Sequence, residues 1–108
     1  MSARQVSAPL QALQARFVAL NRERAAELAI LEARASRGID RVASLLAIGE
    51  IAHKIGGLAG TLGLPEIGAT ALRLDRAILP LHRGGVDPAA LWDECAPLLS
   101  RLIADLAP

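Results

Sequence analysis

His53 is the residue of this chain best suited to chemistry, and it lies in an apolar segment rich in glycine. A neutral imidazole carries a free nitrogen lone pair near neutral pH, so it is a competent nucleophile for group transfer. The other histidine, His82, lies between Pro80 and Gly85, and we interpret it as a solvated loop residue. The single cysteine, Cys95, is more typical of a small buried residue than of a reactive thiol. His53 is therefore the candidate reactive group.

The segment around His53 has the periodicity of a helix. Successive residues of a helix are turned by about 100°. Five apolar residues recur at spacings of three and four and form a seam that must face the core: Ile48, Ile51, Ile55, Leu58 and Leu62. His53 falls on the side roughly opposite this seam. We therefore expect its imidazole to point into solvent, although a lone histidine in an apolar helix is often a satisfied core residue.

Four glycines surround His53 on the same outer face: Gly49, Gly56, Gly57 and Gly60. Each glycine in a helix interior costs about 1 kcal/mol relative to alanine. One interpretation is close helix packing, which the spacing of Gly56 and Gly60 would allow. The other is clearance of side chains, so that a second protein can bring a reactive group onto the ring. We favour clearance because it accounts for all four glycines.

The rim of this predicted docking face consists of Leu46, Glu50 and Lys54. Leu46 lies two helical turns before His53 and offers a partner an apolar contact. Apart from Glu50, no acid or base is patterned beside the histidine. The chain also lacks a glycine-rich phosphate loop and the hydrolase and kinase signatures. We therefore expect no autonomous enzyme, and a partner must supply the rest of the chemistry.

The elements that position His53 are predicted to be helices. A chain of 108 residues with 53% hydrophobic content suits one small domain over residues 1–108. Phe17 and Trp92 are the only aromatic residues, so the core consists mainly of small aliphatic side chains, which favours packed helices over sheets. We expect an all-α fold, an antiparallel four-helix bundle with a possible extra short N-terminal helix.

Residues that favour turns and caps define the expected helix boundaries. The first stripe, from residue 9 to about 35, predicts either two helices joined near Asn21 or one bent helix. Gly38 suits the left-handed residue after this segment, and Asp40 is expected to cap the helix that carries His53.

That helix is expected to end near Leu62, before Gly63, and Pro65 suits the first turn of the next helix. Residues 80–85 are expected to form a loop. Asp87 and Pro88 then open a last helix that reaches about residue 106, with a kink or short break at Pro97.

Charge and composition exclude several classes of partner. A net charge of +1 leaves no field to hold a nucleic acid backbone. The longest apolar run, residues 42–48, is far shorter than a membrane span, and residues 1–25 lack the apolar segment of a signal peptide. One cysteine allows no internal disulfide and argues against a structural metal site. We expect a cytoplasmic protein, a monomer without membrane contact.

The run AHKIGGLAGTLG at residues 52–63, followed by Leu64 and Pro65, resembles the signature of histidine-containing phosphotransfer (HPt) domains. That signature reads roughly A-H-x-L-[K/A]-G-[S/A]-A-x-x-[F/L]-G. The resemblance is strong over residues 50–76. It continues into the next helix at positions where such domains often carry Leu, Ala, Leu and Glu: Ile67, Ala71, Leu74 and Asp75.

The resemblance implies a four-helix bundle in a two-component phosphorelay. His53 would accept a phosphoryl group from the aspartyl phosphate of one receiver domain and pass it to another. Gly57 matches the family glycine that leaves the ring accessible. The receiver of a histidine kinase or response regulator would supply the acidic pocket, a magnesium ion and a lysine, and the bundle would need no cofactor of its own.

Two positions depart from the family pattern. Many members carry Lys three residues after the histidine, where this chain has Gly56, and a small polar residue at the position of Leu58. We interpret Leu58 as part of the apolar seam and Lys54 as a secondary candidate for contact with the phosphate. Two alternatives remain open: an adaptor that binds a receiver or kinase without phosphorylation, and a helical oligomerisation module in which Gly49, Gly56 and Gly60 form a helix contact.

Overall fold

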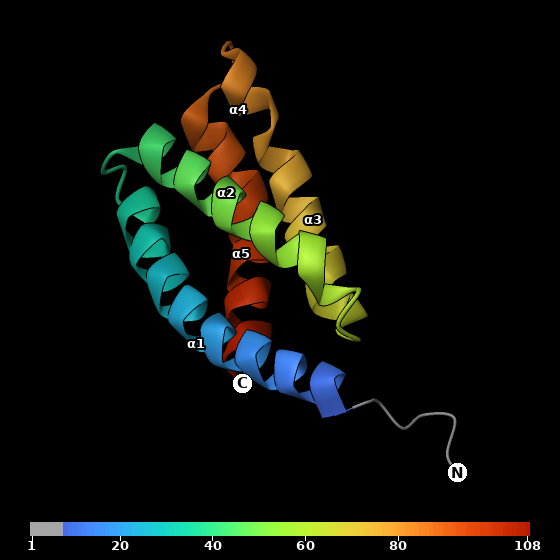
Figure 1. Ribbon diagram of the computed structural model, residues 1–108. Coiled ribbons are helices and arrows are strands. Elements are labelled where there is room, and N and C mark those ends of the chain that lie inside the picture. Colours follow the sequence, from blue (N-terminus) through green and yellow to red (C-terminus); the bar gives the residue numbers. More distant parts are fainter. Residues whose placement is uncertain (1–7) are drawn as a thin grey trace.

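The computed structural model describes residues 8–108, and this part of the chain contains helices and no strands. The helices are α1 (Ala8–Ser36), α2 (Arg41–Ala59), α3 (Pro65–Ile78), α4 (Pro80–Arg83) and α5 (Pro88–Leu106). The four long helices form a bundle, and α4 is a single turn at the end where α3 leads into α5 (Figure 1). The predicted all-α bundle is confirmed. Among residues 8–108 the short helix is α4, between α3 and α5, and the predicted extra N-terminal helix is absent from these residues because α1 is undivided.

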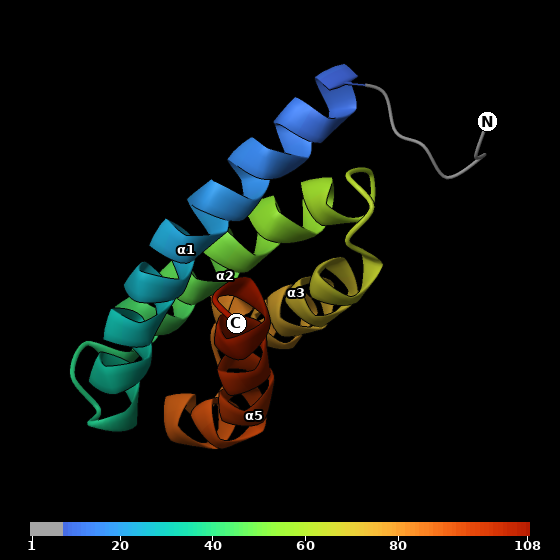
Figure 2. The same cartoon turned by 90° about the horizontal axis from the view of Figure 1, so that it is seen from below.

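Each long helix packs mainly against two others. α2 lies between α1 and α3, and α5 completes the bundle by packing against α1 and α3. Figure 2 shows α1 running alongside α2. Aliphatic side chains from all four helices fill the core, including Leu28, Leu45, Ile48, Ile55, Leu74, Ile78, Leu99 and Leu102. This arrangement leaves one face of α2 uncovered, and His53 lies on that face.

α1 is one continuous helix, curved in Figure 1, so of the two alternatives the single bent helix is correct. Asn21 does not cap a second helix. Asn21 is only 2% exposed and lies on the buried stripe with Phe17 and Leu28. The apolar pattern of α1 is interrupted near residue 21 because the polar Asn21 occupies a core-facing position.

The turn between α1 and α2 has two residues with positive φ. Gly38 has φ 72°, as predicted for the residue after a helix. Asp40 also has positive φ, 43°, and its side chain makes no capping hydrogen bond. Asp40 therefore occupies the predicted N-cap position, but its side chain does not cap the helix. The carboxylate of Asp40 pairs instead with Arg34 on α1, at 2.6 Å.

The end of α2 is held against α1. The helix ends at Ala59, and residues 60–63 form a turn in which Gly63 has φ 82°. The side-chain amide of Gln14 donates to the carbonyl of Leu62 at 2.6 Å. Pro65 occupies the first turn of α3, as predicted.

The connection from α3 to α5 and the course of α5 each differ from the prediction in one detail. Residues 80–83 form the short helix α4, where a loop is predicted, because Pro80 suits a first helical position. The predicted cap is confirmed, since the Asp87 side chain accepts from the amide of Ala89 at 3.2 Å. α5 continues through Pro97 without the predicted break.

Within residues 8–108, α2 is the one helix long and apolar enough to cross a membrane by length and composition. The sequence argument considered only the uninterrupted run at residues 42–48 and so overlooked this property. In the bundle α2 contributes Leu45, Ile48 and Ile55 to the core between α1 and α3, so its apolar side is used for packing.

Candidate functional site

His53 lies near the middle of α2 and points away from the core. Its side chain is 74% exposed, whereas Ala52 before it and Ile55 after it are fully buried. The prediction of an outward imidazole is confirmed. The cause is the periodicity of α2, whose buried side faces α1, α3 and α5.

The imidazole of His53 has one fixed partner, the carboxylate of Asp75 on α3. His53 Nδ1 lies 2.9 Å from Asp75 Oδ2. A carboxylate only accepts hydrogen bonds, so in the neutral ring Nδ1 carries the proton and Nε2 carries the lone pair. Asp75 is 20% exposed and sits on a helix that packs tightly against α2. The carboxylate therefore orients the ring and leaves Nε2 available to an incoming group.

The contact with Asp75 was not predicted. From the sequence, Glu50 was the one acid expected beside His53, but Glu50 pairs with Lys54 at 3.5 Å, along the surface of α2. Asp75 lies 22 residues after His53. A signal was present, because Asp75 directly follows Leu74 at the edge of the buried stripe of α3. Using it requires knowing which edge of α3 meets α2.

The four glycines near His53 divide into two pairs. A Cβ atom added at Gly57 or Gly60 would have no neighbour within 4 Å, so these two glycines do clear the surface. A Cβ at Gly49 would lie 3.1 Å from the Ile78 side chain, and one at Gly56 would lie 2.7 Å from the Leu72 side chain. The clearance interpretation is therefore wrong for Gly49 and Gly56, which let α3 approach α2.

Leu58 does not belong to the buried seam, contrary to the prediction. It is 50% exposed, while its neighbours Ile55 and Ala59 are fully buried and provide the core contacts. Ile51, at the same edge of the stripe, is only half-buried. The seam is therefore narrower than the spacing of three and four suggests, and Leu58 adds an apolar side chain to the surface beside Gly57.

A surface hollow of about 710 Å³ lies next to His53. It is lined by Ala43, Leu46, Ala47, Gly49, Glu50, His53, Lys54, Asp75 and His82. Of the residues predicted to form the docking face, the hollow brings Leu46, Gly49, Glu50 and Lys54 together with His53. Gly56, Gly57 and Gly60 lie outside it. His82, on α4, is exposed as expected, but its place on the rim of this hollow was not foreseen.

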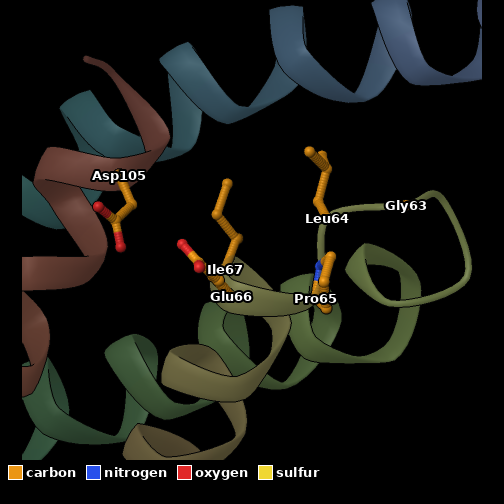
Figure 3. Close-up of a pocket in the computed structure, with 6 residues that line it drawn as sticks. All are labelled: Gly63, Leu64, Pro65, Glu66, Ile67 and Asp105. Atoms are coloured by element: carbon orange, nitrogen blue, oxygen red, sulfur yellow. The ribbon is translucent and has the colours of Figure 1, made fainter.

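A second hollow, of about 420 Å³, lies between the start of α3 and the end of α5 (Figure 3). Its lining includes Leu64, Ile67 and the carboxylates of Glu66 and Asp105, and it shares no residue with the hollow at His53. In residues 8–108, no group of three or more His, Cys, Asp or Glu side chains is arranged to hold a metal ion. The side chains with reactive potential gather at His53.

Cys95 is buried in α5, as predicted. Burial is the main cause that raises the pKa of its thiol to about 11, and the charge of Glu94 adds to the shift. The thiol is therefore protonated at neutral pH and is a poor nucleophile.

The helical bundle presents one exposed histidine whose ring a carboxylate orients, an arrangement that suits nucleophilic group transfer. The comparison with protein families agrees, because the Hpt domain family matches residues 10–107. The chain belongs to this family, whose members act in histidine phosphotransfer within two-component phosphorelays. No curated protein and no solved structure matches the chain.

Proposed function

We propose that this protein is a phosphorelay intermediate in which His53 is the phosphoacceptor. His53 takes the phosphoryl group from the aspartyl phosphate of one receiver domain and passes it to another receiver. One observation carries the proposal: in a chain of the Hpt family, an exposed imidazole has its Nδ1 held by Asp75 and its Nε2 free.

The chemical step uses the lone pair of Nε2. That lone pair attacks the phosphorus, and the bond from phosphorus to the receiver's carboxylate oxygen breaks with its electron pair leaving on the oxygen. The ring gains positive charge, and its proton stays on Nδ1, facing the carboxylate of Asp75 at 2.9 Å. In the return step a second receiver carboxylate attacks the phosphorus, and the N–P electron pair goes back to Nε2.

The receiver provides the groups that stabilise charge in the transition state. These are an acidic pocket, a magnesium ion and a lysine, which act on the phosphoryl oxygens as the group transfers. The bundle provides the nucleophile and a docking face. Gly57 and Gly60 leave space beside the ring, and Leu46, Glu50 and Lys54 line the approach. In this proposal the protein works in the cytoplasm as a monomer.

The test is phosphotransfer from a panel of phosphorylated receiver domains of the same organism, scored as acid-labile label. His53→Gln should abolish labelling, because the variant lacks the imidazole nitrogen that Asp75 orients for attack. His82→Gln is the matched control and should keep the label, since it changes the only other histidine, on the rim of the same hollow.

Label on wild type and on the His82 variant, but not on the His53 variant, supports the proposal. Absence of label on every protein contradicts it, provided that the same receivers label another Hpt domain in parallel. In that case an adaptor without phosphorylation becomes the better interpretation, and it predicts that His53→Gln still binds a receiver.

A further inference from the structure

Lys54 is the single lysine among twelve basic residues of this chain, and it directly follows His53. We propose that Lys54 is the cation that holds the phosphoryl group on His53, and that phosphorylation makes it exchange Glu50 for the phosphoryl oxygens. This inference rests on the proposed function. It identifies a positioning residue for the phosphorylated state.

Phosphorylation creates an electrostatic problem at this site. A phosphoryl group on Nε2 brings close to two negative charges at neutral pH. The hollow beside it already contains the carboxylates of Asp75 and Glu50. Among the residues that line the hollow, Lys54 is the one with a permanently cationic side chain; His82 is the other basic residue. The positive charge of Lys54 is therefore the one available in this hollow at neutral pH to offset the negative charge of the phosphoryl group.

Packing against α3 determines from which side a cation can approach. A Cβ atom at Gly56 would lie 2.7 and 2.8 Å from two atoms of the Leu72 side chain, so α3 occupies the space a long side chain there would need. Asp75 occupies the same side of the ring. Lys54 lies about 100° around the helix from His53, on the side that faces α1, and it also lines the hollow at His53.

The present partner of Lys54 is easily replaced. The ammonium lies 3.5 Å from Glu50 Oε1, and the two side chains are 61% and 71% exposed. Solvent screens such a pair, so it stabilises the fold weakly. A phosphoryl group carries close to two negative charges, so it attracts the ammonium more strongly than the single charge of Glu50 does. A lysine suits this exchange because its compact ammonium on a flexible four-carbon chain can turn between two partners.

The first experiment uses phosphoramidate as the donor, because this small molecule phosphorylates without a docking face. Ammonia leaves as the N–P bond to Nε2 forms. The measurement is the half-life of the acid-labile phosphate at neutral pH. Lys54→Gln should shorten it by about fivefold, because a neutral amide replaces a charge-assisted contact. Lys54→Arg should keep most of the wild-type half-life. Glu50→Gln should leave the half-life unchanged or lengthen it.

Arg101→Gln is the matched control. Arg101 forms an exposed pair with Asp105 at 4.0 Å, with the same spacing along α5 that Glu50 and Lys54 have along α2. This variant loses the same charge and the same kind of pair away from His53. It should keep the half-life of wild type. Equal half-lives for wild type and Lys54→Gln overturn the inference.

A second measurement observes Lys54 directly. Protein labelled with ¹⁵N-lysine gives one ammonium signal, because the chain has one lysine. Without phosphorylation, the ammonium signal of Glu50→Gln should differ from that of wild type. Phosphorylation should shift the wild-type signal, and the phosphorylated forms of wild type and Glu50→Gln should then give the same signal. If the ammonium signal is the same before and after phosphorylation of His53, the inference is overturned while the proposed function stands. If wild type gains no acid-labile phosphate from either donor, the proposed function itself fails.

Discussion

The two glycine pairs around His53 have the same residue type and the same helix, yet they do different things. Gly57 and Gly60 face open space on the surface beside the imidazole. Gly49 and Gly56 face α3, where Ile78 and Leu72 occupy the space of the missing side chains. The first pair keeps the ring accessible, and the second lets α3 approach close enough for Asp75 to reach Nδ1.

This difference shows that accessibility and orientation of the imidazole have separate structural causes. A docking protein needs the open pair, whereas the tautomer of His53 needs the packed pair. Substitutions at the open pair should therefore change access of a partner to the ring, and substitutions at the packed pair should change the packing of α3 and the tautomer of His53.

The largest effect is expected from Gly57→Leu. A branched side chain one turn after His53 would stand in the space through which a receiver approaches, while the helix itself tolerates leucine. We expect the rate of transfer from a receiver to fall by at least about 100-fold, which corresponds to about 2.7 kcal/mol of barrier. Labelling by phosphoramidate should change little, because that donor is small. An equal loss with both donors would contradict the docking role of this glycine.

Asp75→Asn should lower transfer from a receiver by about 30-fold, or about 2 kcal/mol. An amide can donate to Nδ1, which moves the ring proton to Nε2 and removes the attacking lone pair. Histidine ¹⁵N spectra of the variant should show this change of tautomer. Asp105→Asn is the control and should transfer like wild type, because Asp105 pairs with Arg101 on α5 and does not line the hollow at His53.

Alanine substitutions compare the two glycine pairs by stability. Gly57→Ala should raise the free energy of unfolding by up to about 1 kcal/mol, because alanine is the better helix former and nothing obstructs its methyl group. Gly56→Ala should lower it by about 1 kcal/mol, because the new methyl group would overlap Leu72. Urea denaturation measures both. Equal changes in the two variants would show that α3 does not depend on a glycine at residue 56.

A smaller effect is expected at Cys95, away from both pairs. Its pKa is raised from 9.0 to about 11, so the unfolded chain loses this proton before the folded chain does. Stability from this group is therefore complete below about pH 9 and is lost as the pH rises toward 11, by about 1.4 kcal/mol at pH 10. Denaturation of Cys95→Ala should lack this part of the pH dependence. Identical slopes in both proteins would rule it out.

Most of the fold was predictable from sequence because it depends on local patterns. The turn glycines at 38 and 63, which have positive φ, are properties of neighbouring residues, and so is the cap at Asp87. The outward direction of His53 follows in the same way from the periodicity of α2.

The rest of the site depends on how two helices meet. Which glycines face α3, and whether an acid of α3 reaches the ring, depends on the rotation and height of α3 relative to α2. The spacing of residues within α2 gives neither the rotation nor the height of α3. For this reason all four glycines were assigned one role and the contact with Asp75 was not predicted. Leu58 was misplaced for a related reason, since the width of the buried seam depends on how much of α2 the other helices cover.

The most direct test of the central claim is to determine which nitrogen carries the phosphoryl group. Protein labelled with ¹⁵N-histidine is phosphorylated by a receiver and examined by ³¹P and ¹⁵N NMR, and the two histidines are assigned with His53→Gln and His82→Gln. We expect phosphorus bonded to Nε2 of His53, with the remaining proton on Nδ1 beside Asp75. Phosphorus on Nδ1 of His53, or on His82, would contradict it.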